Sequence, residues 1–164
     1  WMIIYVPLYL ATEIGLTWDQ IGTIIAVGLI AYVLFEYPIG VIADRYTGEQ
    51  ELMALGFVIL AISSSWIAFM SVTLIIPWIC IFFLSRIGAS LVEVTTESYF
   101  FKQVRGDGAD FIGIFRLLRP LASLVGALLG TITLLFLPFN LAFIILGLCM
   151  IPGIFFTMRI TDTR

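Results

Sequence analysis

Charged side chains inside otherwise apolar runs are the groups in this sequence that could do chemistry. The longest series has four polar residues at steps of four, three and four: Arg86, Ser90, Glu93 and Glu97. This spacing places all four on one face of a helix. A charge inside an apolar membrane span costs about 3 kcal/mol on insertion scales unless it is paired or hydrated. The series therefore predicts a helix face turned toward other polar groups.

The next apolar run carries Arg116 and Arg119 close to its start. Two acids, Glu93 and Glu97, lie at a similar depth in the preceding run, so the four residues predict an ion-pair cluster between two helices. Such a cluster has two interpretations. It either holds the helices together or takes part in moving a solute or an ion across a membrane.

Two further charges are candidates for a cavity or a coupling site. Arg86 is the base nearest the middle of its run, at the depth where membrane transporters hold their substrates, and we predict that it faces a water-filled cavity. There it would bind an anionic group or pair with an acid. Glu36 lies in an earlier run, beside Tyr37 and Pro38. It is either a protonatable coupling residue or an acid that pairs with a neighbouring helix.

Composition indicates lipid as the solvent for much of this chain. Apolar residues make up 62% and charged residues 12%, whereas soluble domains are about half apolar and a quarter charged. Histidine is absent and no acids show metal-ligand spacing, so we expect no metal site, no cofactor and no enzymatic activity. The net charge of −3, without a basic run, gives no indication of nucleic-acid binding.

Apolar run lengths predict an all-α membrane protein with six transmembrane helices. The predicted ranges are 1–10, 21–43, 52–70, 74–100, 111–135 and 141–158, with Thr17 as the N-cap of the second helix. The first range is too short to span a bilayer, so we expect residues 1–164 to be one six-helix bundle whose first helix is truncated.

Basic residues predict the orientation of the bundle. Arg45 lies in the predicted link 44–51, Lys102 and Arg105 lie in the link 101–110, and Arg159 and Arg164 lie in the tail. The other links carry no lysine or arginine. By the positive-inside rule, these two links and the C-terminus face the cytoplasm.

Glycines in the second and fifth predicted helices give two further expectations. Gly22 and Gly40 recur at nearly the interval of Gly113 and Gly130, which is how a three-plus-three inverted repeat would look, although glycine is common in membrane helices. Ala122, Gly126 and Gly130 follow one another at steps of four, and such a ladder predicts close approach of another helix.

The link after the second helix resembles the loop motif of the major facilitator superfamily. That motif contains Gly, three residues, Asp, a basic residue, one residue, Gly and two basic residues. Gly40, Asp44 and Arg45 fit it, but Gly48 comes one residue late and Glu49-Gln50 replaces the basic pair. The stretch 86–104 and the ending Asp-Thr-Arg also look like the carboxyl-terminal half of bacterial members.

This resemblance implies helices seven to twelve of a twelve-helix bundle that works by alternating access against an amino-terminal six-helix half. Asp44 and Arg45 would then be gating residues, and Tyr5, Tyr9 and Tyr32 would be candidates to line the cavity. The implied function is secondary active transport of a small solute in a bacterial cytoplasmic membrane, with Glu36, Glu93 and Glu97 available to carry protons for a coupling ion. The alternative is a non-transporting membrane scaffold or assembly protein of the same fold.

Overall fold

The computed structural model describes residues 2–104 and 109–160, and in this part of the chain all regular structure is helical. Its α-helices are α1 (Met2–Tyr9), α2 (Trp18–Ile42), α3 (Glu49–Ile67), α4 (Ile75–Gln103), α5 (Ala109–Phe136) and α6 (Phe139–Thr157). Five of them, α2 to α6, are long and apolar enough to cross a membrane, and the apolar helix Met2–Ile14 is shorter. The predicted all-α membrane fold is confirmed.

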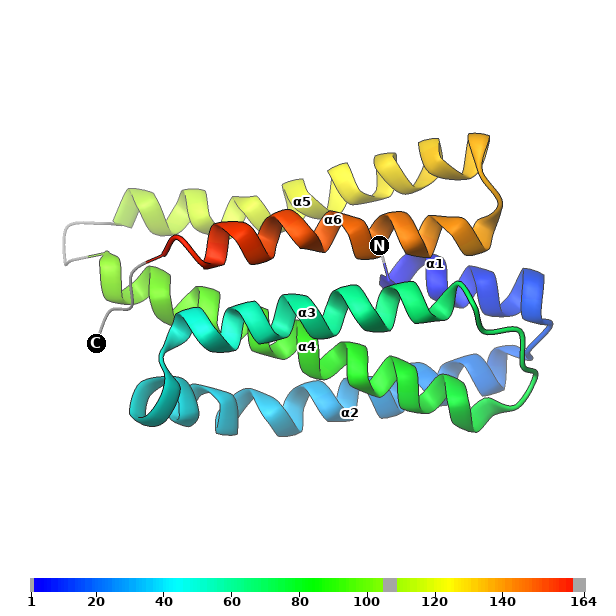
Figure 1. The fold of residues 1–164 in the computed structure, drawn as a ribbon, viewed down its shortest axis with the longest axis horizontal. Helices are drawn as coiled ribbons and strands as arrows, with labels where there is room; N and C mark the ends of the chain where they lie inside the picture. The colour runs from blue at the N-terminus through cyan, green and yellow to red at the C-terminus, as the bar shows by residue number, and fades with distance from the viewer. Residues whose placement is uncertain (1, 105–108, 161–164) are drawn as a thin grey trace.

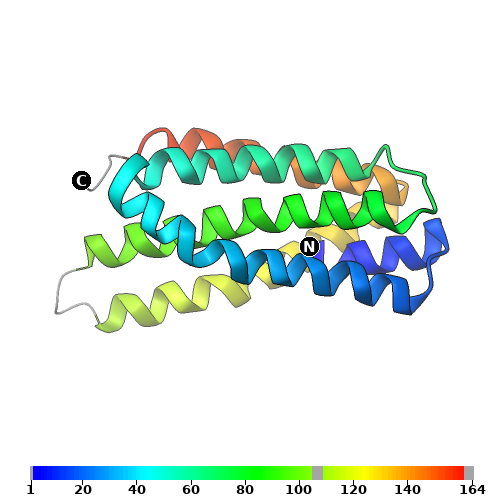
Figure 2. The ribbon, with the colours of Figure 1, turned by 90° about the horizontal axis from the view of Figure 1, so that it is seen from below.

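The helices lie lengthwise beside one another in an elongated bundle (Figure 1). The α2–α3 link, the end of α4, the start of α5 and the end of α6 lie together at one end, and the α3–α4 and α5–α6 turns lie at the other (Figures 1 and 2). The main packing contacts join α3 to both α4 and α6, and α2 to α4. Arg45, Lys102 and Arg159 therefore lie toward the same end of the bundle, whereas Arg105 and the residues 161–164 lie outside the described part of the chain.

The first helical segment extends farther along the chain than the predicted range 1–10. After α1, a π-helical turn, η1 (Leu10–Ile14), continues the helix beyond the predicted end near Leu10. Gly15 then ends it in the left-handed region, at φ 77°. The predicted cap at Thr17 is confirmed as a capping box with Gln20, so α2 begins at Trp18 instead of Ile21.

The two predicted polar links are also largely helical. A π-helical turn, η2 (Ala43–Thr47), follows α2, and α3 already begins at Glu49, so Gly48 alone separates them. Gly48 adopts φ 89° and ψ 162°, a conformation that only glycine takes up readily. Where we predicted a loop over 44–51, the structure thus has a π-helical turn and the start of α3, because Glu49 and Glu51 favour the positive end of the α3 dipole. In the link 101–110, residues 101–103 belong to α4 and 109–110 to α5, whereas 105–108 are outside the described residues.

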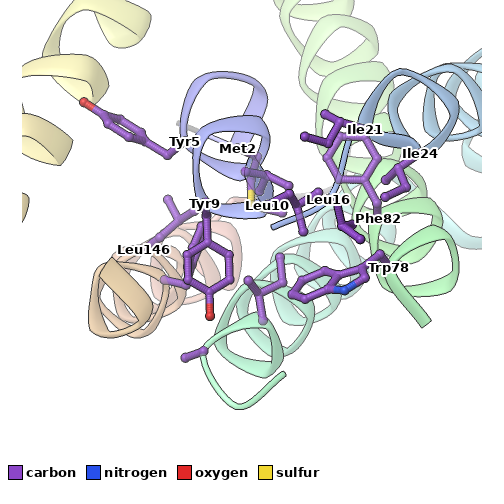
Figure 3. Close-up of a cluster of buried hydrophobic side chains, with 14 residues drawn as sticks. Met2, Tyr5, Tyr9, Leu10, Leu16, Ile21, Ile24, Trp78, Phe82 and Leu146 are labelled. Atoms are coloured by element: carbon purple, nitrogen blue, oxygen red, sulfur yellow. The ribbon is translucent and has the colours of Figure 1, made fainter. Parts of the chain in front are cut away.

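An aromatic cluster joins α1, α4 and α6, and Figure 3 shows two of its members, Tyr9 and Trp78. The ring of Tyr9 meets those of Trp78, Phe139 and Phe143 edge-on, with centroids 6.1, 5.3 and 5.2 Å away. The indole N–H of Trp78 donates to the Val72 carbonyl at 2.8 Å. The short first helix is therefore anchored by large buried side chains.

Small residues bring the central helices close together, but not where the ladder on α5 predicts it. Gly56 and Gly88 lie at the α3–α4 crossing, where a Cβ added to Gly56 would lie 2.9 Å from the Gly88 carbonyl oxygen. On α5, a Cβ at Gly126 would meet nothing within 4 Å, whereas one at Gly130 would overlap the ring of Tyr5. The prediction of close helix packing along the ladder was therefore wrong except at Gly130.

Candidate functional site

Helix α5 stands apart from the rest of the bundle and is attached by a few specific contacts. No residue in the most apolar part of its span is buried within the bundle. Near its C-terminal end, the Tyr5 hydroxyl donates to the Ala127 carbonyl at 2.7 Å, and Figure 3 shows Tyr5 directed away from the aromatic cluster toward α5. Near its N-terminal end, Phe115 stacks on Phe100 of α4 with centroids 4.0 Å apart.

The third attachment of α5 is an ion-pair cluster. Arg119 Nη2 binds Glu97 Oε1 at 2.8 Å and also contacts Glu93 Oε1. Three of the four residues that the sequence predicts for this cluster are thus brought together. The fourth, Arg116, joins no ion pair within the described part of the chain.

A cavity of about 820 Å³ lies between α4 and α5, with walls from α3 and α6. Its volume falls within the range of small-molecule sites. All four charged residues of the predicted cluster line it, together with apolar side chains that include Phe57, Leu60, Phe115 and Met150. Arg116 is therefore a cationic group at the cavity wall, whereas Arg119 is shared by the two carboxylates.

Arg86 does not line this cavity. It is only 8% exposed and lies where α2 and α4 pack, with its Cγ 3.1 Å from the point that a Cβ on Gly28 would occupy. Its guanidinium carbon lies 5.0 Å from the centroid of the Phe82 ring. The sequence predicts a position facing a water-filled cavity, and the structure instead packs most of the side chain between two helices.

The residues of the loop motif belong to a second polar cluster at one end of the bundle. Lys102 Nζ binds Asp44 Oδ1 at 2.8 Å and also contacts Glu49 Oε1, which in turn accepts a hydrogen bond from Ser98 at 3.3 Å. Glu49 is fully buried. The resemblance implies that Asp44 acts against an amino-terminal half, but its carboxylate is paired with Lys102 of this chain.

The other motif residues have different surroundings. Arg45 is exposed and joins no ion pair among the described residues, and a Cβ added to Gly40 would lie 3.8 Å from Val94. Sequence reasoning missed the pairing of Lys102 with Glu49. The available signal was their placement at helix ends on the same predicted side of the membrane.

The remaining candidates are distributed over the bundle. Glu36 is exposed on α2, outside the ion pairs of the described residues, and Tyr32 is half-buried on the same helix. Tyr9 belongs to the aromatic cluster and lines a cavity of about 440 Å³ at the opposite end of the bundle from the Lys102 cluster, together with Glu13 and Asn140.

Replacing Tyr5 by phenylalanine tests how firmly α5 is attached. The change removes the hydrogen bond to the Ala127 carbonyl and the contact of the hydroxyl with Thr131 at 3.0 Å. We expect a loss of about 1 kcal/mol in unfolding free energy, the usual net contribution of one hydrogen bond, and faster hydrogen exchange in the second half of α5. Exchange measured by mass spectrometry, with α3 as internal control, checks this. Unchanged exchange in α5 would contradict it.

Comparison with known proteins gives one match. A family model described as Major Facilitator Superfamily matches residues 1–164. No curated protein matches this chain, and no solved structure matches it.

Proposed function

The chain belongs to the major facilitator superfamily, a family of transporters, and we propose that it forms the carboxyl-terminal half of a secondary active transporter. In this proposal it moves a small solute by alternating access, paired with an amino-terminal six-helix half, and it couples the movement to an ion. The end of the bundle that holds Arg45 and Lys102 faces the cytoplasm.

The observation that carries the proposal is the charged wall of the cavity between α4 and α5. Glu93 and Glu97 share Arg119, and this shared contact is one of the few that hold α5 against the bundle. Protonation of either carboxylate would weaken the ion pair and release part of α5. The protonation state of Glu93 and Glu97 would thereby be linked to the position of α5. Ion-coupled transport requires such a link between ion binding and conformation.

The polar cluster of Lys102, Asp44 and Glu49 at the cytoplasmic end supports a gating role for the loop motif. Lys102 binds Asp44 at 2.8 Å, so in this proposal Asp44 holds η2 against α4 within the carboxyl-terminal half. The exposed Arg45 is then the motif residue available to the amino-terminal half. The gating role that the resemblance implies for Gly40, Asp44, Arg45 and Gly48 is kept. In this assignment Asp44 binds α4 of the same half, and Arg45 contacts the amino-terminal half.

Replacing Glu93 and Glu97 by glutamine, singly and together, tests the coupling. The full-length protein is reconstituted in vesicles that contain a pH-sensitive dye, and proton uptake is followed after addition of solutes from a panel. We expect the double variant to lose solute-driven proton uptake by about tenfold or more, because an amide cannot carry the proton, while solute exchange without a proton gradient persists.

Glu51→Gln is the matched control, because Glu51 is an exposed acid of α3 that joins no ion pair among the described residues. Its proton uptake should equal that of the wild type. Normal uptake in the double variant would remove the two glutamates from the coupling step. A correctly folded wild-type protein that moves neither solute nor protons would instead support the scaffold alternative.

A further inference from the structure

We infer that Arg86 binds the acidic group of an organic anion, so that the solute carries a carboxylate or a phosphate. This inference rests on the proposed transport function and names the substrate class. It starts from the surroundings of Arg86, which lies near the middle of α4, is 8% exposed and packs over Gly28 of α2. Because residue 28 has no side chain, the arginine stem can lie directly against the α2 backbone.

The guanidinium of Arg86 has no negative partner in the described part of the chain. All four ion pairs described there use Lys102 or Arg119 as the base. Arg86 Nε is sealed from solvent and donates to no acceptor among the described residues, while the guanidinium carbon lies over the face of the Phe82 ring. A cation–π contact satisfies part of the charge but accepts no conventional hydrogen bond.

A second unsatisfied donor lies one turn along the same helix. Ser90 is fully buried, and its hydroxyl has no hydrogen-bond partner among the described residues. Positions 86 and 90 share one face of α4, because residues four apart lie above one another on a helix. Buried polar groups are nearly always hydrogen-bonded, so two neighbouring exceptions require an explanation.

The chemistry of the two donors defines the ligand that would satisfy them. A guanidinium keeps its proton even when it is buried. Its positive charge is therefore compensated by a nearby anion and not by loss of the proton. Its planar fork fits the two oxygens of a carboxylate or phosphate, and a serine hydroxyl can donate to a second polar group of the same molecule. The structure therefore favours an organic anion with a second polar group over a neutral or cationic solute.

The same negative charge could come from an acidic side chain elsewhere in the full-length protein, and the unliganded stability of Arg86→Gln distinguishes the two sources. If the anion belongs to the solute, Arg86 is unpaired without solute, and removing its charge should raise the Tm of the purified protein. If an internal carboxylate pairs with Arg86, the variant leaves that carboxylate alone and the Tm falls. A fall in Tm would overturn the inference.

Ligand binding supplies the second readout. The full-length protein is heated with acetate, succinate, glucose 6-phosphate or inorganic phosphate, and with glucose as a neutral control. We expect at least one anion to raise the wild-type Tm by about 5 °C at saturation, Arg86→Lys to keep a smaller shift, and Arg86→Gln to show none. Arg159→Gln, which changes an exposed base at the end of the bundle and outside both cavities, should keep the full shift.

Two results would overturn the assignment of an anionic solute. One is a wild-type protein that none of the four anions stabilises, and the other is an equal anion shift in Arg86→Gln. Proton-coupled movement of a neutral solute by both the wild type and Arg86→Gln would also overturn it. That last result would leave the proposed transport function intact, so the two failures are distinguishable.

Discussion

Replacing Gly88 by leucine is expected to destabilise the bundle strongly. Gly88 lies at the crossing of α3 and α4, where a Cβ would be 2.9 Å from Ile59 Cγ2 and 3.1 Å from the Gly56 carbonyl oxygen. The second contact is with backbone, which cannot rotate away as a side chain can. Overpacking a well-packed interior costs about 1–3 kcal/mol, and backbone that must separate raises this further. We expect a large loss of monodisperse protein in detergent and a Tm lowered by about 10 °C or more.

Gly126→Leu is the matched control, since it puts the same side chain on a glycine of another membrane helix. A Cβ there would meet nothing within 4 Å, so the Tm should stay close to that of the wild type. Size-exclusion profiles and thermal unfolding followed by tryptophan fluorescence would measure both variants. Equal stability of Gly88→Leu and the wild type would show that α3 and α4 lie farther apart at Gly88 than the structure places them.

The second large effect is expected from replacing Lys102 by methionine. Lys102 forms an ion pair with Glu49, whose side chain is 1% exposed, and it also binds Asp44 at 2.8 Å. Removing one partner of a buried ion pair costs about 3–5 kcal/mol, but Lys102 remains 37% exposed and water screens part of the interaction. We therefore expect a loss of about 1–3 kcal/mol, measured by chemical or thermal unfolding.

A double variant separates the ion pair from general damage. If the cost of Lys102→Met arises from the buried charge of Glu49, then adding Glu49→Gln should restore part of the stability, because a neutral amide needs no counter-charge. Arg45→Met changes an exposed base that joins no ion pair among the described residues, and it should change the stability by less than about 0.5 kcal/mol. Additive losses in the double variant would contradict the proposed pairing.

Much of the fold follows from the sequence because membrane helices need long apolar runs. The run from 111 to 135 predicts most of α5, and the run from 141 to 158 predicts most of α6. Errors gather where polar residues are helical, as at Ala43–Thr47 and Glu49, since polarity near a helix end looks the same as polarity in a loop. A capping residue such as Thr17 marks a helix start more reliably, because its side chain has a specific bond to make.

The sequence predicts which residues belong to the candidate site, but it does not predict all of their contacts with other helices. Spacing on α4 and α5 indicates that Glu93, Glu97 and Arg119 can meet, because each lies on a polar face at a similar depth. Spacing alone does not show that Arg86 turns toward α2, since that depends on the missing side chain of Gly28 on another helix. The pairing of Lys102 with Glu49 likewise requires the relative positions of α3 and α4, which single-helix periodicity does not contain.

From the unequal lengths of α5 and α6 we expect the α4–α5 cavity to respond to the thickness of the surrounding bilayer. Helix α5 has 28 residues, about 42 Å at 1.5 Å per residue, whereas α6 has 19 and is about 28 Å long. The hydrocarbon core of a bilayer is about 30 Å thick, so α6 fits it upright and α5 is left with hydrophobic mismatch that tilting relieves. Because few contacts hold α5, we expect a thinner bilayer to increase its tilt against α6 and to reshape the cavity wall. Bilayer thickness would thereby act on the same charged residues, Glu93, Glu97 and Arg119, that we propose for proton coupling.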